Sequence, residues 1–312
     1  MSWAEVMVDW AIQVPGGEGT WVDLILSSED RFYNQFIPLP GLTDLRLECR
    51  TPRGSDKMMS VWEIRVFTEG RLPDWVQVWR RMEGDADLML LSAHPDDELL
   101  WFGGTLPLYA GETKKKVIVA YLVNTAAARK SELLDGLWLC GVRDYPVMGE
   151  FRNGFSLSRS EMYKLWGEET VLRKIVSLIR TYRPKVLLTH DLQGEYGHGA
   201  HRVCADAAVK AFKLAADPRF RPGTQEPWQV SKLYLHLLDE NPLRMDWSRP
   251  LMRFGGETSL SVAKRAFEQH ISQRRTEYQV LDTGPYDCSL FGLHSSMVGP
   301  DTELDGFFEN IL

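Results

Sequence analysis

The stretch Leu88-Met89-Leu90-Leu91-Ser92-Ala93-His94-Pro95-Asp96-Asp97-Glu98 joins a short apolar run to a cluster of polar side chains. A bounded apolar run of this kind is typical of a strand that is buried on both faces of a sheet. Similar runs recur at residues 117–123, 186–188 and 233–238, and amphipathic segments lie between them. This alternation predicts an α/β fold with a mostly parallel sheet that carries helices on its faces.

Three amphipathic segments predict the helices of this region. Residues 160–182 repeat apolar side chains at helical spacing, with Leu165 among them, and Pro184 ends the pattern. A second helix is expected after the third strand, with an apolar stripe formed by Val203, Ala207, Ala211 and Leu214. A third is expected over residues 261–281, with inward side chains at Phe267, Ile271, Tyr278 and Leu281.

The first 80 residues show a different pattern. Candidate strands at 21–26, 45–49 and 60–67 are separated by clusters of Gly, Pro, Asp and Ser. The third has the alternating period of a half-buried strand. We therefore expect a small β-rich, sandwich-like domain over residues 1–80 and an α/β domain over residues 85–312.

Composition limits the class of protein. The 312 residues are 44% hydrophobic and 25% charged, and 11 Trp, 10 Tyr and 13 Phe provide ample material for a core. The formal net charge is −7 and no basic stripe is present, so nucleic acid is not an expected partner. The four cysteines are far apart and form no CxxC pair, so they predict no disulfide framework.

The N-terminus and the apolar runs bear on location. Residues 1–9 carry acids where a secretory signal has basic and then apolar residues. The longest clean apolar run, residues 117–123, is far shorter than the roughly 18 residues of a spanning helix. We therefore expect a soluble protein without a membrane partner, cytoplasmic by default.

Polar side chains follow two of the predicted strands. His94-Pro95-Asp96-Asp97-Glu98 comes after the first, and His198-Gly199-Ala200-His201 comes after the third, at the start of a helix. Ligands of open α/β sheets bind outside the carboxyl ends of the strands, so both segments lie where a site is expected. A nitrogen and an oxygen from the first segment and a nitrogen from the second give three metal ligands and leave a position open for water, as catalytic zinc requires.

Each of the two motifs has a purely structural interpretation when it stands alone. The first is compatible with a turn whose aspartate caps a helix, and a lone His-x-x-His is weak evidence for a metal. Together, at the carboxyl ends of two predicted parallel strands, they favour a metal site with a base beside it.

The segments Ala93-His94-Pro95-Asp96-Asp97-Glu98, Gly103-Gly104-Thr105 and His198-Gly199-Ala200-His201 resemble motifs of the PIG-L (LmbE-like) N-acetylglucosaminyl deacetylases. The resemblance covers about residues 85–312. It implies a Rossmann-like fold and a metal-dependent hydrolase that removes the acetyl group from an N-acetylated sugar or glycoconjugate.

The resemblance also implies roles for individual residues. The zinc ligands it implies are His94, Asp97 and His201. Asp96 would act as the general base, and His198 would stabilise the oxyanion and protonate the departing amine. These roles agree with general chemistry, because a carboxylate that is not committed to the metal is free to take a proton from water, and a cationic imidazole supplies both charge stabilisation and a proton.

The second motif departs from the family pattern. Many members carry His-Pro-Asp-His, whereas this chain has Gly199 and Ala200 between its two histidines. If the missing acid orients a neighbouring side chain elsewhere in the family, another carboxylate must do so here, and Asp191 and Glu195 are the candidates.

Further residues are candidates for contact with substrate. Arg129, with Glu132 three residues on, resembles the Arg-x-x-Glu of the family and is expected to bind a sugar hydroxyl or an anionic group, or else to form a surface ion pair. His294 is expected either to reach the cleft from the C-terminal segment or to be an ordinary core or surface histidine. Glu98 is expected to support the first turn of its helix.

Three functions remain open at this point. The first is deacetylation of an N-acetylated sugar of the N-acetylglucosamine type. The second keeps the metal but acts on a non-sugar amide, because zinc chemistry alone does not select a sugar. The third is a noncatalytic carbohydrate-binding protein, against which the intact Asp96 and His198 argue.

Overall fold

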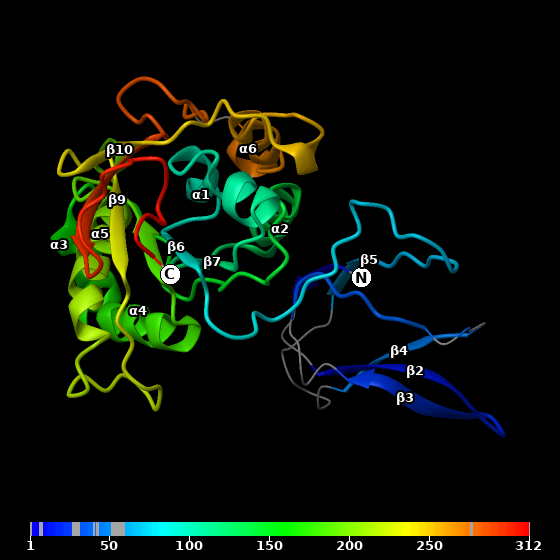
Figure 1. Cartoon of the computed structure of the whole chain (residues 1–312). Helices are drawn as coiled ribbons and strands as arrows, with labels where there is room; N and C mark the ends of the chain where they lie inside the picture. Colours follow the sequence, from blue (N-terminus) through cyan, green and yellow to red (C-terminus); the bar gives the residue numbers. More distant parts are fainter. Residues whose placement is uncertain are drawn as a thin grey trace. The chain divides into compact units, whose positions relative to one another are not determined.

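The computed structural model consists of two compact units, Met1–Trp79 and Arg80–Leu312 (Figure 1). The described residues are 2–5, 9–26, 32–39, 41, 44–50, 60–274 and 277–311. None of the helices in these ranges combines the length and the apolar character that crossing a bilayer requires.

The first unit holds two small antiparallel sheets. Their pairs are β2 (Trp10–Gly17) with β3 (Thr20–Leu26), β2 with β4 (Arg46–Cys49), and β1 (Ser2–Glu5) with β5 (Ser60–Glu63). Trp10 and Ile12 on β2 are buried, and partly buried apolar side chains pack against them. The small core of this unit is therefore centred on β2.

Two of the three strands expected in this unit are confirmed, as β3 and β4. The third was expected over residues 60–67 but ends at Glu63. Beyond it Ile64 is 56% exposed and Val66 is 68% exposed. The alternating pattern continues past the strand, but these two apolar side chains are exposed and pack into no core formed by the described residues.

The second unit is built on a six-stranded sheet with the order β10-β11-β9-β8-β6-β7. Its strands are β6 (Leu88–Ser92), β7 (Val117–Tyr121), β8 (Val186–Thr189), β9 (Lys232–His236), β10 (Pro242–Arg244) and β11 (Leu290–Ser296). The first four are parallel, whereas β11 runs antiparallel to both β9 and β10. The α/β class with a mostly parallel sheet is confirmed, and the antiparallel pair at one edge had not been predicted.

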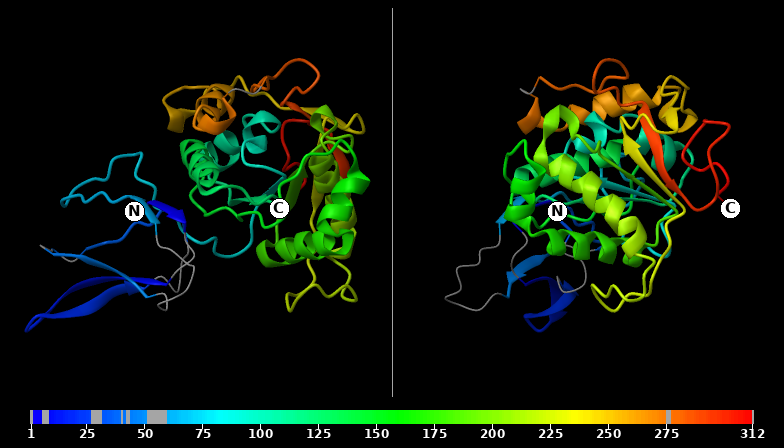
Figure 2. Two further views of the ribbon diagram at one scale, coloured as in Figure 1. Left: turned by 180° about the vertical axis from the view of Figure 1, so that it is seen from behind. Right: turned by 90° about the vertical axis from the view of Figure 1, so that its left-hand side faces the viewer.

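Helices lie on both faces of this sheet (Figures 1 and 2). They are α1 (Asp97–Leu100), α2 (Ala127–Leu139), α3 (Arg159–Trp166), α4 (Glu168–Tyr182), α5 (Gly199–Leu214) and α6 (Ser259–Phe267), with short helical turns η1 (Pro107–Glu112), η2 (Glu195–Gly197), η3 (Met252–Phe254) and η4 (Ile271–Gln273). α3, α4 and α5 cover one face, where Ile175 and Ala207 join Leu187 of β8 in the main core. α1, α2 and α6 lie on the other face.

The helix expected over residues 160–182 is two helices, α3 and α4. Gly167 separates them with a φ of 79° and a ψ of 114°, a conformation that favours glycine and cannot continue a helix. Leu165, which lies within α3, is 41% exposed. The helix after the third strand is confirmed as α5, and three residues of its predicted stripe, Val203, Ala207 and Ala211, are fully buried.

The prediction of a helix over residues 261–281 is wrong for most of that range. α6 ends at Phe267, and His270 has a non-helical φ of −77° and ψ of 65°. Ile271 is 62% exposed and Leu281 is 42% exposed, although both had been predicted to point inward. Residues 275 and 276 of the expected helix lie outside the described ranges.

The strand order places two loops beside each other. In the sheet, β6 has β7 on one side and β8 on the other. The connection that leads from β7 to β8 along the chain therefore passes over β6. Such a switch point leaves a crevice at the carboxyl ends of the strands, which is where open α/β sheets bind ligands. The polar segments after β6 and β8 therefore meet at one edge of the sheet.

Candidate metal centre and catalytic site

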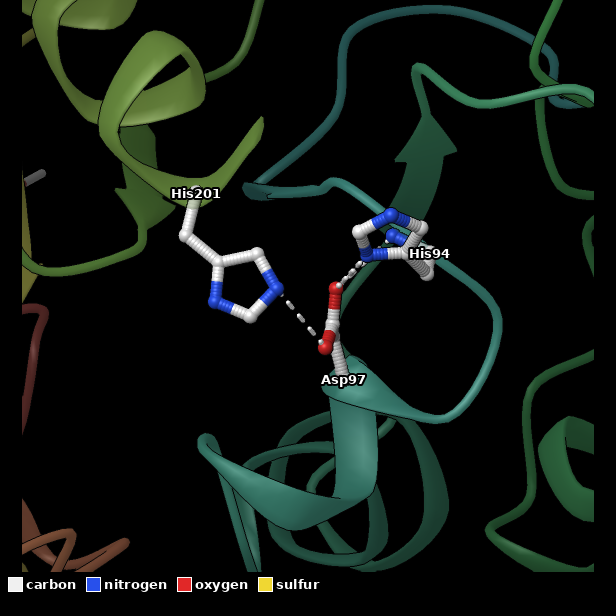
Figure 3. A group of neighbouring side chains, drawn as sticks. All are labelled: His94, Asp97 and His201. Atoms are coloured by element: carbon white, nitrogen blue, oxygen red, sulfur yellow. Dashed lines mark hydrogen bonds and ion pairs between the residues drawn. The ribbon is translucent and has the colours of Figure 1, made fainter. Parts of the chain in front are cut away.

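Three side chains from this edge form a compact cluster (Figure 3). His94 lies in the turn after β6, Asp97 begins α1, and His201 lies in the first turn of α5. All three are buried. The structure thus brings together the residues that the sequence analysis expected to hold a metal.

The carboxylate of Asp97 lies between the two rings. Its Oδ2 is 3.1 Å from His94 Nδ1, and its Oδ1 is 3.3 Å from His201 Nε2. The indole of Trp101 donates a hydrogen bond of 2.8 Å to Oδ1, and the backbone N–H of His94 donates one of 2.7 Å to Oδ2. One potential ligand atom of each of the three residues lies within 4.8 Å of the others.

The donor set fits a zinc ion. His201 Nε2 is buried and forms no well-aligned hydrogen bond among the described residues, although it lies 3.3 Å from Asp97 Oδ1. Burial lowers the pKa of His201, but Asp97 and Glu195 outweigh it and raise the pKa to about 10. The surroundings of His201 therefore favour positive charge. Two imidazoles with one carboxylate also form a ligand set that zinc accepts while keeping a coordination position open.

A second cluster, formed by His190, Glu195 and His201, does not offer a comparable ligand set. His190 Nε2 accepts a hydrogen bond of 3.0 Å from the backbone N–H of Ala93, and its Nδ1 lies 2.9 Å from Glu195 Oε2. Both ring nitrogens of His190 are therefore engaged in hydrogen bonds. We interpret this cluster as structural support behind the first one.

The candidate metal centre borders a cavity of about 240 Å³. Its lining includes His94, Asp96, Asp97, Arg129, Asn153, His198 and the aromatic side chains of Trp101, Phe155, Tyr196 and Tyr278. A site with ionisable groups beside an open cavity is the arrangement that a hydrolytic enzyme needs.

Asp96 is held in a strained backbone conformation, with a φ of 107°. Its backbone N–H donates to Glu98 Oε2 at 2.8 Å, and its Oδ2 accepts from Arg129 Nη2 at 3.0 Å. Burial and the neighbouring Asp97 raise the pKa of Asp96 to about 7, although Arg129 opposes this. Strain and a displaced pKa on one residue are typical of a functional group.

His198 caps the start of α5. Its Nδ1 accepts a hydrogen bond of 3.1 Å from the backbone N–H of Ala200. Burial, reinforced by the nearby His201 and His94, lowers the pKa of His198 to about 3. The hydrogen bond from Ala200 leaves Nε2 as the ring nitrogen that can donate a proton.

Arg129 lines the cavity and also supports its neighbours. The same nitrogen that contacts Asp96 donates a hydrogen bond of 2.7 Å to the carbonyl oxygen of Pro95. Glu132 lies further along α2 and accepts hydrogen bonds from the backbone N–H and the hydroxyl of Ser272. These contacts connect α2 to the turn that carries Pro95 and Asp96 and to η4.

His294 is not among the residues that line this cavity. It lies on β11, where its Nδ1 is 2.8 Å from the Ser295 hydroxyl. Because β11 runs antiparallel to β9, Phe291 pairs with His236 at the catalytic edge, while Leu293 pairs with Tyr234 nearer the middle of the sheet. His294 therefore lies away from that edge, which agrees with the second of the two alternatives considered for it.

Sequence reasoning missed two buried histidines behind the site. His190 directly follows β8 and His236 ends β9, and both contact Glu195. Their position at the carboxyl ends of two predicted strands was the signal that could have identified them.

The Gly103-Gly104-Thr105 segment has a packing role. A Cβ at Gly103, whose φ is +47°, would lie 2.5 Å from the sulfur of Cys288, and a Cβ at Gly104 would lie 2.5 Å from the hydroxyl of Ser259. Only glycine permits these approaches. The two glycines thus let the C-terminal segments close over α1.

The same region of the chain matches a known family. The sequence model described as GlcNAc-PI de-N-acetylase, PIG-L, matches residues 89–212. A 1D-myo-inositol 2-acetamido-2-deoxy-alpha-D-glucopyranoside deacetylase of Thermobifida fusca is 31% identical over 194 residues, which are 52% of this chain and 67% of that protein. The chain belongs to the PIG-L family. The resemblance noted in the sequence is thereby confirmed.

Other relatives are matched over a smaller share of their own length. The 1D-myo-inositol 2-acetamido-2-deoxy-alpha-D-glucopyranoside deacetylase 1 of Frankia alni is 32% identical over 173 residues, which are 46% of this chain and 60% of that protein. The chain thus spans less than two thirds of the length of several curated relatives that it matches.

Solved structures resemble this PIG-L family member more distantly. The conserved protein TT1542 from Thermus thermophilus is 22% identical with a TM-score of 0.45, covering 60% of this chain and 80% of that one. The N,N'-diacetylchitobiose deacetylase from Pyrococcus horikoshii is 19% identical with a TM-score of 0.44, covering 61% of this chain and 71% of that one.

Proposed function

We propose that the unit Arg80–Leu312 is a zinc-dependent deacetylase that removes the acetyl group from an N-acetylated sugar of the N-acetylglucosamine type. The observation that carries this proposal is the convergence of His94, Asp97 and His201, whose potential ligand atoms lie within 4.8 Å of one another, at a cavity that Asp96 also lines. Membership of the PIG-L family and the names of the relatives support the acetamido sugar as substrate.

His94, Asp97 and His201 would hold the zinc ion. When bound, zinc supplies Lewis acidity that polarises the acetyl carbonyl and makes a water more acidic. Trp101 and the backbone of His94 hold the Asp97 carboxylate in place, so the ligand set is preorganised by α1 and the turn before it.

Asp96 would act as the general base. Its carboxylate lines the cavity beside the ligands but is not one of them, so it is free to accept a proton at a carboxylate oxygen. Arg129 orients it through Oδ2, and Glu98 holds its backbone N–H.

His198 would stabilise the developing oxyanion. Because Nδ1 accepts from Ala200, the proton of the neutral ring lies on Nε2 and is available for donation to a substrate oxygen. A neutral ring has no second proton for the amine. Asp96, which holds a proton after deprotonation of the water, therefore joins His198 as a group that would protonate the departing amine.

Acetate release and metal content together test this function. The full chain is assayed with N-acetylglucosamine, with N-acetylglucosaminyl-inositol and with a non-sugar acetamide, alongside elemental analysis for zinc. We expect about one zinc per chain and acetate release from the sugars. Release from the non-sugar amide alone would assign a different amidase, and bound zinc with no turnover of any of the three would refute a deacetylase.

A further inference from the structure

Glu195 lies behind the candidate metal centre and contacts three imidazoles. Its Oε2 is 2.7 Å from His201 Nδ1 and 2.9 Å from His190 Nδ1, and its Oε1 is 2.7 Å from His236 Nδ1. All four side chains have no exposed surface. Glu195 is not among the residues that line the cavity, so its contacts are to protein groups rather than to a substrate there.

The hydrogen bonds around Glu195 determine which atoms carry protons. His190 Nε2 accepts from the backbone N–H of Ala93, so the proton of that ring is on Nδ1 and is donated to Glu195. The backbone N–H of Asp191 also points at Glu195, at 3.3 Å from Oε1. Both oxygens of the carboxylate are therefore acceptors, and His201 must present an N–H at Nδ1.

We propose that Glu195 is a positioning residue for the metal: by accepting from Nδ1–H of His201 it turns the Nε2 of that ring toward Asp97. A metal-bound histidine commonly donates its other ring N–H to a carboxylate, which fixes the tautomer and the orientation of the ring. This inference rests on the proposed zinc site, but it does not depend on the substrate or on the acetyl chemistry.

The position of Glu195 makes it the acid that the second motif lacks. Gly199 and Ala200 between the two histidines offer no carboxylate, whereas Glu195 reaches His201 from the turn η2 before α5. His236 extends the support to the antiparallel edge of the sheet, because its Nε2 lies 3.1 Å from the carbonyl oxygen of Asp287. The orientation of His201 is thereby tied to the ends of β8 and β9.

The isosteric substitution Glu195→Gln tests the role of the carboxylate. Both oxygens of Glu195 accept from N–H groups, so either orientation of an amide would place its NH2 group against another N–H. We expect zinc affinity to fall roughly 10- to 100-fold, as is usual for loss of a carboxylate behind a metal-bound histidine. Glu195→Asp keeps the charge and is expected to recover part of this loss.

Zinc affinity is measured by competition with a chelator, and Asp206→Asn on the same helix α5 is the matched carboxylate-to-amide control. Unchanged zinc affinity in Glu195→Gln would overturn the inference.

The wild-type protein provides a second test that needs no variant, since nitrogen NMR of the zinc-loaded chain should find the proton of His201 on Nδ1 and the metal on Nε2. The reverse assignment, or a wild-type chain that binds no zinc, would also overturn it. A wild-type chain that binds zinc but releases no acetate would refute the proposed function alone.

Discussion

Arg129 holds both the side chain and the backbone of the turn that carries Asp96. Its Nη2 lies 3.0 Å from Asp96 Oδ2 and 2.7 Å from the carbonyl oxygen of Pro95. Arg129 comes from α2, whereas Glu98 holds the backbone N–H of Asp96 from α1. The proposed base is thus fixed from two directions by two helices.

Replacing Arg129 by Met should lower kcat roughly 10- to 100-fold, because a base that is misplaced by a fraction of an ångström loses much of its effect. Zinc content should not change, since the hydrogen bonds of Arg129 go to Asp96 and Pro95 rather than to the three ligand side chains. Steady-state kinetics with the deacetylation substrate check the prediction. Arg219→Met, which removes an exposed ion pair to Asp217, is the control.

The same kinetics distinguish the two roles considered for Arg129. If Arg129 mainly binds a hydroxyl or an anionic group of the substrate, its loss should raise KM and leave kcat nearly unchanged. If it mainly orients Asp96, kcat should fall while KM changes little. A variant with wild-type kcat would therefore contradict the orienting role.

The strained backbone of Asp96 predicts a difference between two inactive variants. Asp96→Ala and Asp96→Gly both remove the carboxylate and its bond to Arg129, but only glycine adopts a φ of 107° without steric cost. Strain of about 1–3 kcal/mol is relieved in the glycine variant, and the greater freedom of glycine in the unfolded chain costs about 0.5–1 kcal/mol. We expect Asp96→Gly to be more stable than Asp96→Ala by about 1 kcal/mol in urea unfolding. Equal stability of the two variants would show that the backbone is not strained here.

Much of the second unit could be predicted because its signals are local. The two runs that precede the polar segments are short, apolar and bounded, and they form β6 and β8. The two polar segments then meet because parallel strands end at one edge of a sheet. The cluster of His94, Asp97 and His201 follows from these rules together with the family resemblance.

Other features depend on contacts that are distant in sequence. The periodicity of residues 160–182 is helical throughout, and only the positive φ of Gly167 divides it into α3 and α4. Of the two alternatives considered for His294, a place on the cavity wall is not seen, because the direction of β11 is set by its pairing with β9. Glu195 was one of two candidates from sequence, and the structure distinguishes them by its direct contact with His201.

Asp206 lies outside the candidate site, and its contacts predict how the stability of the fold depends on pH. Its carboxylate accepts from Tyr163 Oη at 2.6 Å and lies 2.7 Å from Lys210 Nζ and 2.8 Å from Arg159 Nη1. Burial raises the pKa of Asp206, but the hydrogen bonds from Lys210 and Tyr163 outweigh it and hold the pKa below its usual value. The folded state therefore favours the ionised form, and the resulting stability is present above the unfolded pKa of about 4.

This stability is lost as the pH falls through the folded pKa of Asp206. The variant Asp206→Asn should therefore be less stable than wild type by about 1–2 kcal/mol at pH 7, and the difference should shrink as the pH is lowered below about 4. Urea midpoints measured between pH 7 and the lowest pH at which the chain stays folded check this. A difference that does not shrink over that range would contradict the assignment to the carboxylate.

Zinc binding should stabilise the wild-type chain and a matched histidine variant, but not a variant that lacks a ligand. His201→Ala removes one of the three proposed zinc ligands, whereas His294→Ala removes a ring on β11 whose Nδ1 contacts the Ser295 hydroxyl. At free zinc about 100 times its Kd, linkage predicts about 2.7 kcal/mol of added stability for a single site. Thermal unfolding with zinc and with a chelator should therefore show a rise in Tm for wild type and His294→Ala, and little or none for His201→Ala. An equal rise in all three proteins would mean that zinc binds elsewhere, because His201 supplies the nitrogen on which the proposed centre depends.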